Sequence, residues 1–384
     1  MLTLVSAFLL TACSDDSEHD GKSPVTIEAI PCAQTFVKVE PTSFSRAWQM
    51  PEGFSSYETL NGVFSNQSNL VNNDFDIFFT QADGTYNEAM FTKGLDGRWW
   101  ASFKEQISSG TYYLYGYSPF INTVTASIAP NSTYSEGAVI TLSNLPSVTP
   151  NDVCVVIGAK NGKASYRADG DYEVAGLAKG NFTYESTGSD NYLFLLFDHI
   201  YSAMHFRFRV DGDYAALRTI KLKRLELLAY GYNESTMRRS VNATITLKAN
   251  GSDSSPIVGD IGFSTDGSSE MDPVIIFNNT DAPVTLPSGV DNNYNYLYAE
   301  FLGSFVPTAI GSFTLISTYD VYDTKGHLIR NNCVARNFLR IEDLYDRQTV
   351  TKRGWKYAVN LSIEPTYLYV LSEPDLDSPT VVVN

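Results

Sequence analysis

The sequence carries little charge, and little positive charge above all. Charged residues make up 18% of the 384 residues, against about 25% in a typical soluble domain. Only 27 Lys and Arg stand against 43 Asp and Glu, which gives a formal net charge of −16. Such a chain repels a phosphate backbone, so nucleic acid is a poor partner. With 43% hydrophobic residues, the chain can still bury a core and is expected to fold.

Histidine is scarce, and fixed-period repeats are missing. No two of the four histidines are spaced four apart, as two metal ligands on one helix face would be, so a zinc hydrolase is not expected. His199 follows Asp198 in an apolar stretch, and we interpret it as a hydrogen-bonded structural residue without catalytic chemistry. The sequence therefore predicts no catalytic residue, no metal site and no cofactor. The lack of a repeat argues against a solenoid or propeller.

Long hydrophobic runs are also missing, apart from one at the N-terminus. Residues 2–12 are apolar and end in small residues, which is too short for a membrane-spanning helix but typical of a signal peptide. The run ends in Leu-Thr-Ala-Cys13, which resembles a bacterial lipobox and implies cleavage before Cys13 and acylation of its thiol. A secretion signal cut nearby is the alternative. Residues 13–24 are acidic and polar, as expected of a tether.

The remaining cysteines give no disulfide framework. Cys32, Cys154 and Cys333 are odd in number and far apart, and buried free thiols are the simplest interpretation. Cys154 lies in an apolar run where any small hydrophobic residue would serve, whereas a catalytic cysteine needs a polar setting.

The abundant aromatic residues, 22 Phe and 24 Tyr, favour strands. Short apolar or alternating runs are separated by candidate hairpin turns, namely Asp83-Gly84, Asp96-Gly97, Asn161-Gly162, Asp169-Gly170, Asn250-Gly251 and Asp266-Gly267. Helical periodicity is weak, and only residues 338–345 suggest a short helical turn. The pattern breaks over residues 180–190 before an apolar run resumes. We therefore predict an all-β fold of two tandem β-sandwich domains, residues 25–188 and 189–384.

Four segments together resemble the fimbrillin family, the lipoprotein precursors of type V pili in Gram-negative anaerobes. They are an aromatic strand ending in Tyr-x-Pro (110–119), a Phe-x-His strand (196–206), a penultimate strand (354–361) and an Arg-Ala-Trp segment (46–48). The resemblance implies two transthyretin-like β-sandwich domains and a precursor carried to the outer membrane. It further implies cleavage by an arginine-specific protease between Arg46 and Ala47, and polymerisation with other pilus subunits into a surface fimbria by strand exchange.

The residues before Arg46 look like strand material by themselves. Arg46 is the only arginine before Arg98 and lies in an irregular, Ser-rich and Pro-bounded stretch that a protease would reach. Lys38 is an alternative cleavage point, and Arg46 as an ordinary surface arginine is the alternative to processing. The removable first-strand region (25–46) has alternating apolar residues, namely Val25, Ile27, Ala29, Val37 and Val39.

The C-terminal region contains the clearest strand pattern. Apolar and polar residues alternate strictly from Trp355 to Ile363. The tail that follows (366–384) is apolar and β-prone, and we predict that it is a donor strand that fills a groove in a neighbouring subunit. The alternative is an ordinary last strand of its own domain. The candidate donor residues are Tyr367, Leu368, Tyr369, Val370, Leu371, Val381, Val382 and Val383.

The sequence thus predicts a pilus subunit that polymerises after proteolysis and supports adhesion, and no enzyme. One alternative is a monomeric surface glycan-binding lipoprotein that stacks sugars on Trp99, Trp100 and neighbouring tyrosines such as those of residues 112–117. Another is a β-sandwich hydrolase, which needs two paired carboxylates, but no spacing among the many acids selects a pair.

Overall fold

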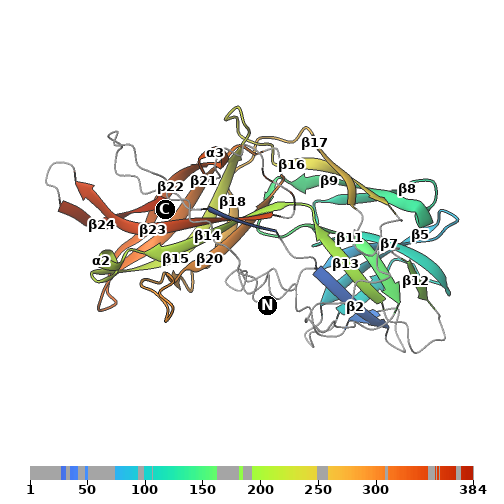
Figure 1. Ribbon diagram of the computed structural model, residues 1–384, viewed down its shortest axis with the longest axis horizontal. Coiled ribbons are helices and arrows are strands. Elements are labelled where there is room, and N and C mark those ends of the chain that lie inside the picture. The colour runs from blue at the N-terminus through green and yellow to red at the C-terminus, as the bar shows by residue number, and fades with distance from the viewer. Residues whose placement is uncertain are drawn as a thin grey trace, which may run out of the picture.

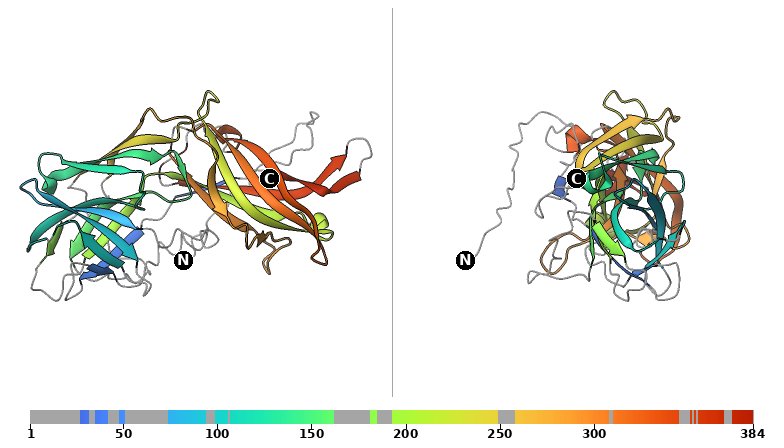
Figure 2. Two further views of the ribbon diagram at one scale, coloured as in Figure 1. Left: turned by 180° about the vertical axis from the view of Figure 1, so that it is seen from behind. Right: turned by 90° about the vertical axis from the view of Figure 1, so that its right-hand side faces the viewer.

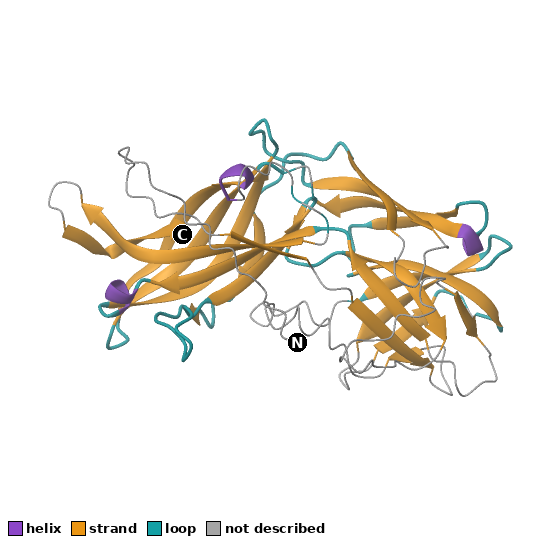
Figure 3. Ribbon diagram, viewed as in Figure 1, coloured by secondary structure: helices purple, strands orange, loops and turns teal. Residues whose placement is uncertain are grey.

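The structure of the protein is a computed structural model. The structure describes residues 27–31, 35–41, 48–50, 74–93, 99–105, 107–161, 181–184, 193–248, 258–307, 310–344, 351, 353, 355–368 and 373–383. Strands dominate them, with a few short helical turns (Figure 3). None of the helices in these ranges has the length and apolar character needed to span a membrane.

The largest sheet closes on itself. Its antiparallel order is β11-β13-β2-β3-β6-β5-β4-β7-β12, and β7 also pairs with β11, so the sheet closes into a ring of eight strands, with β12 paired to β7 as an additional strand. The strands are β2 (Thr35–Pro41), β3 (Trp48–Met50), β4 (Phe75–Thr80), β5 (Tyr86–Lys93), β6 (Trp99–Phe103), β7 (Gly110–Ser118), β11 (Cys154–Asn161), β12 (Asn181–Tyr184) and β13 (Leu193–His199).

A four-stranded sheet of order β17-β16-β9-β8 covers part of the outside of this ring. Its strands are β8 (Thr125–Pro130), β9 (Gly137–Pro146), β16 (Ser240–Lys248) and β17 (Val258–Thr265), and the 3-10 turn η1 (Tyr134–Glu136) lies between the first two. The apolar side chains divide accordingly. Phe79 and Leu114 belong to the cluster inside the ring, whereas Tyr117 of the ring packs outward with Ile140 and Ile245.

Two further sheets enclose the largest apolar core, at the other end of the elongated molecule (Figure 1). One has the order β1-β23-β14-β20-β10, with β24 also paired to β23, and the other has the order β18-β15-β21-β22, with β19 paired to β15. The first consists of β1 (Ile27–Pro31), β10 (Val148–Thr149), β14 (Ser202–Val210), β20 (Ala299–Phe305), β23 (Trp355–Leu368) and β24 (Glu373–Val383). The second consists of β15 (Arg218–Tyr230), β18 (Val274–Asn278), β19 (Val284–Thr285), β21 (Ser312–Asp323) and β22 (Leu328–Arg340), and the helices are α2 (Gly212–Ala215) and α3 (Ile341–Leu344).

The predicted all-β fold is confirmed. Four of the residues expected on the buried face from residue 355 onward, Tyr357, Val359, Leu361 and Ile363, lie in the large core. Ser362, expected on the exposed face, is also fully buried. The short helical turn expected within 338–345 is present as α3. Of the predicted hairpin turns, Asp83-Gly84 joins the paired strands β4 and β5 as expected. The hairpin predicted at Asp266-Gly267 is wrong, because the strands on either side of it, β17 and β18, belong to different sheets. Gly84 and Gly267 both have the positive φ that glycine favours (93° and 79°), and the glycines of the other four pairs lie outside the described residues.

The domain boundary near residue 188 stays a prediction. Strands from either side of it pair with each other, since β16 pairs with β9 and β10 pairs with β20. The leading segment, which we define as residues 27–41, also divides between sheets. Its first strand, β1, joins the sheet of β23, whereas β2 joins the closed ring (Figure 1).

Candidate functional site

One edge of β23 holds strands from both ends of the chain. β14 pairs in parallel with β23 from Lys356 to Ile363 and so occupies its other edge. The remaining edge pairs with β1 from Trp355 to Val359 and with β24 from Leu361 to Leu368, both antiparallel. Because both strands run in the same direction, the end of β24 meets the start of β1. The N- and C-terminal strands therefore form one composite edge strand along β23 (Figure 1), at the end of the molecule that Figure 2 shows from two further sides.

The second half of the leading segment closes the ring. β2 pairs with β13 from Leu193 to Phe197 and with the short strand β3 through Glu40 and Pro41. Without β2, the ring would lose its closure, and β13 and β3 would each gain a free edge. We call the β23 edge from Trp355 to Val359 the β1 track, and the β13 edge from Leu193 to Phe197 the β2 track.

The two tracks approach each other where the leading segment changes sheets. Pro31 at the end of β1 pairs with Trp355, and Thr35 at the start of β2 pairs with Phe197. Just before β23, the Nη1 of Arg353 donates a hydrogen bond to the backbone oxygen of His199, at 2.7 Å. This contact joins the start of β23 to the end of β13, so it fixes one track relative to the other.

The structure places part of the predicted first-strand region. Ile27 and Ala29 lie in β1 opposite Val359 and Tyr357. Val37 and Val39 lie in β2 and pair with β13. Cys13, Val25, Arg46 and Ala47 lie outside the described residues, so lipidation and processing stay predictions.

The predicted donor residues divide between two strands. Tyr367 and Leu368 end β23, and Val381, Val382 and Val383 end β24, whereas Tyr369, Val370 and Leu371 lie outside the described residues. In this single chain, β24 pairs with its own β23, which is the arrangement of an ordinary last strand. Its role as a donor strand stays a prediction.

A polar cluster of Asp152, Cys154 and His199 lies beside the β2 track. Cys154 opens β11 and is the direct partner of His199, which ends β13. The Nδ1 of His199 lies 2.5 Å from a carboxylate oxygen of Asp152 and 3.4 Å from the Cys154 sulfur. Burial alone would lower the pKa of His199, but the neighbouring Asp152 and Cys154 outweigh it and raise the pKa well above its usual value. The predicted hydrogen-bonded histidine is therefore present, with a partner that sequence reasoning missed.

A pair of carboxyl groups, Asp76 and Glu88, lies on the neighbouring strands β4 and β5. Burial, reinforced by the charge of Glu88, raises the pKa of Asp76 to about 8. Lys104 forms an ion pair with Glu88. Asp76 is only 3% exposed, so a substrate has no access to its carboxyl group. The pair consequently does not resemble the open acid pair of a glycoside hydrolase.

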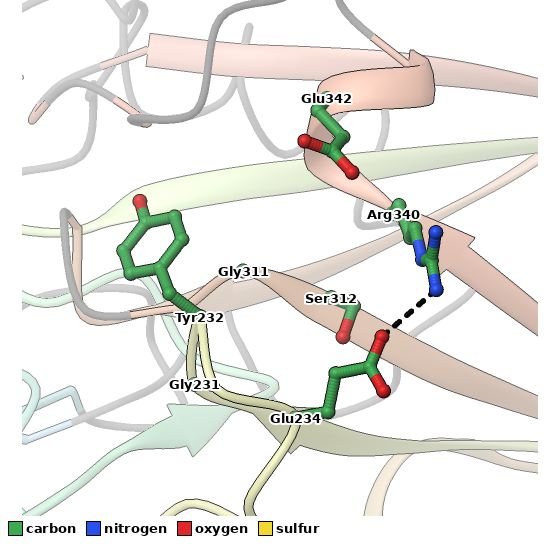
Figure 4. A pocket seen from close by; sticks show the side chains of 7 residues that line it. All are labelled: Gly231, Tyr232, Glu234, Gly311, Ser312, Arg340 and Glu342. Carbon is green, nitrogen blue, oxygen red and sulfur yellow. Dashed lines mark hydrogen bonds and ion pairs between the residues drawn. The ribbon is translucent and has the colours of Figure 1, made fainter.

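A pocket opens where the turn after β15 meets the start of β21 and the end of β22 (Figure 4). Its volume is about 60 Å³, which is room for a few water molecules. An ion pair of 2.8 Å between Arg340 and Glu234 crosses it. Trp99 and Trp100, the predicted sugar-stacking residues, lie in β6, but the structure does not describe their side chains. Glycan binding by these residues therefore stays a prediction.

Comparison with known proteins gives weak likenesses. No protein-family model and no curated protein matches the sequence. Among solved structures, the chain is similar to a "putative cell adhesion protein" from Bacteroides uniformis, with 12% identity and a TM-score of 0.34 over 82% of this chain and 90% of that one. It is also similar to a fimbrial protein from Bacteroides vulgatus, with 12% identity and a TM-score of 0.33 over 81% and 91%. Similarities at these identities and TM-scores assign no function to this chain.

Proposed function

We propose that this chain is a cell-surface pilus subunit whose leading segment temporarily occupies two strand edges. Proteolysis after Arg46 then frees both edges, and a strand from a neighbouring subunit replaces the leading segment. The observation that supports this most directly is the pairing of β1 and β2, which belong to two different sheets and supply an edge strand to one and the closing strand to the other. The solved structures described as fimbrial or cell adhesion proteins agree with the proposal, which does not depend on them.

The strand directions suit an exchange. β1 and β24 both run antiparallel to β23 and follow one another along the same edge. A neighbour's tail that enters in the direction of β24 would therefore meet the freed β1 track in the antiparallel orientation that β1 leaves. Backbone hydrogen bonds then supply affinity with little demand on sequence, which is the basis of strand addition between proteins.

The intact chain keeps its own strand in place because that strand is tethered. The five residue pairs of β1 with β23 contribute about 2–5 kcal/mol, at roughly 1 kcal/mol for each backbone hydrogen bond. This is modest, but a covalently linked strand has an effective concentration of about millimolar or higher, which a separate subunit does not match. Cleavage removes this advantage, so proteolysis acts as the switch. In the precursor, an acylated Cys13 would hold the subunit at the outer membrane.

Limited digestion tests the proposal. Purified full-length chain is treated with trace trypsin, the cleavage point is read by mass spectrometry, and oligomers are measured by light scattering over a range of concentrations. The expected result is one early cut after Arg46, followed by oligomers that grow with protein concentration. The variant Arg46→Ala should neither be cut there nor assemble.

The matched control is Lys38→Ala, which removes the other candidate cut and should assemble like the unmodified chain. A chain ending at residue 365 separates cleavage from exchange, because it should be cut normally and stay monomeric. Normal assembly of that truncated chain, or clipped chains that stay monomeric at every concentration, would contradict strand exchange by the tail.

A further inference from the structure

Three different metal-binding atoms converge beside the β2 track. The carboxylate of Asp152, the sulfur of Cys154 and an imidazole nitrogen of His199 all lie within 4.8 Å of one another. Cys154 and His199 are each about 1% exposed, whereas the Asp152 side chain is 15% exposed. The cluster is therefore closed on the protein side and reaches solvent through Asp152.

We propose that Asp152, Cys154 and His199 form a binding site for a thiophilic divalent transition-metal ion, with zinc as the best match. Thiolate and imidazole ligands select zinc and its neighbours over magnesium or calcium, which take oxygen ligands. The charges also balance. A Cys154 thiolate and an Asp152 carboxylate carry two negative charges, and a divalent ion cancels both, so the loaded site is neutral. Neutrality favours the complex because a buried net charge is costly.

The distance between the sulfur and the imidazole nitrogen is close to that of a zinc site. Ordinary zinc–ligand bond lengths and a tetrahedral angle place sulfur and nitrogen about 3.6 Å apart, and nitrogen and oxygen about 3.4 Å apart. The structure has 3.4 Å between the Cys154 sulfur and Nδ1 of His199, and 2.5 Å between Nδ1 and Oδ2 of Asp152. The sulfur and nitrogen already fit, and the carboxylate oxygen has to withdraw by about 0.9 Å.

The movement required falls on the residue best able to make it. Asp152 precedes β11 and keeps some solvent contact, so a change in its side-chain torsions can move its oxygen outward. The other two ligands are held by the backbone, because Cys154 and His199 are cross-strand partners and Ile200 donates from its backbone N–H to the oxygen of Val153, at 2.9 Å. Water that enters beside Asp152 can complete the tetrahedron.

Such an ion would strengthen the place where the two tracks meet. Arg353 already joins the backbone oxygen of His199 to the start of β23. A metal bound to His199 and Cys154 would add a link between β13 and β11 across the ladder. The inference stands apart from the proposed function, because it requires neither cleavage nor exchange.

Cobalt(II) titration of the full-length chain tests the site, since cobalt replaces zinc and is coloured. The expected spectrum has a near-ultraviolet thiolate-to-cobalt charge-transfer band and visible bands of tetrahedral cobalt, which saturate at one ion per chain and disappear when zinc is added. The variant Cys154→Ser should lose the charge-transfer band. The matched control is Cys333→Ser, a half-buried thiol in β22, and it should keep the band.

A second variant covers the case in which Cys154→Ser does not fold. Asp152→Asn keeps the size of the side chain and should bind cobalt at least about ten-fold more weakly while retaining the sulfur band. Zinc should also raise the melting temperature of the unmodified chain, and should do so less in Asp152→Asn. The proposal is overturned if excess cobalt gives no charge-transfer band, if the band survives in Cys154→Ser, or if Asp152→Asn binds cobalt as tightly as the unmodified chain.

Discussion

Replacing Asp76 with asparagine is expected to stabilise the protein at neutral and higher pH. Asp76 is 3% exposed in β4, and burial together with the charge of Glu88 raises its pKa from the ordinary 3.8 to about 8. In the unfolded chain the same carboxyl group titrates near its ordinary value. Asparagine has nearly the same shape and is uncharged at every pH. It therefore stands in for the protonated carboxyl group that the fold requires, without having to take up a proton.

The sign follows from the direction of the shift. The folded state holds the Asp76 proton up to a pH of about 8. Between about pH 4 and pH 8, the folded state therefore carries one more bound proton than the unfolded state. Stability from this group is complete below about pH 4 and is lost as pH rises towards 8. The upper limit of the slope is about 1.4 kcal/mol per pH unit. We expect an average of about 1 kcal/mol per unit between pH 5 and pH 8, because the slope flattens as the pH approaches the raised pKa of Asp76.

Urea unfolding at pH 5, 6, 7 and 8 measures this slope. The free energy of unfolding of Asp76→Asn should increase relative to that of the unmodified chain as pH rises. The difference between the two chains should be about 2–3 kcal/mol larger at pH 8 than at pH 5. The control is Asp83→Asn in the exposed turn between β4 and β5. The pKa of Asp83 is lowered by hydrogen bonds from Thr85, so its titration lies below this pH range. Parallel pH profiles for Asp76→Asn and the unmodified chain would refute the reasoning.

Two further substitutions test how the ring is packed, with urea unfolding as the measurement in each case. Gly116→Ala should lower the free energy of unfolding by about 3 kcal/mol or more, because the added Cβ would lie 2.2 Å from the backbone oxygen of Asp76. The control is Gly262→Ala, whose Cβ would meet nothing within 4 Å, and it should change the free energy of unfolding by less than about 1 kcal/mol. Phe79→Ala should cost about 3–5 kcal/mol, because this ring is fully buried inside the closed sheet, and Phe338→Ala, at a side chain that is 51% exposed, should cost well under about 1 kcal/mol. Equal losses within either pair would contradict the packing described here.

Local pattern predicted the strands best where one face of a strand is buried. The alternation of residues 355–363 predicted β23 correctly, because successive side chains of a strand point to opposite faces of the sheet and the pattern is visible in neighbouring residues. The apolar residues Ile27, Ala29, Val37 and Val39 likewise lie in strands. Each of these predictions needed only the residues of one strand.

The pairing partner of each strand could not be predicted in this way. The alternation of apolar and polar residues indicates which face of a strand is buried, but not which strand lies alongside it. No local signal in residues 27–31 points to β23, more than 300 positions later. The partner of His199 was missed for a related reason. Asp198 is adjacent in sequence, but adjacent residues of a strand point to opposite faces. The true partner, Asp152, comes from the segment before β11 and reaches His199 only through the pairing of β11 with β13.

The composite edge also limits how subunits can exchange strands under the proposed function. The subunit's own β24 already covers β23 from Leu361 to Leu368, so cleavage leaves a neighbour only the five-residue β1 track on that edge. That track provides about 2–5 kcal/mol of backbone pairing, whereas nanomolar attachment needs about 12 kcal/mol after the cost of association. The β1 track alone is therefore too short to hold a fibre. A donor strand must also fill the β2 track and close the ring again, as the leading segment does, or displace β24 from its own sheet.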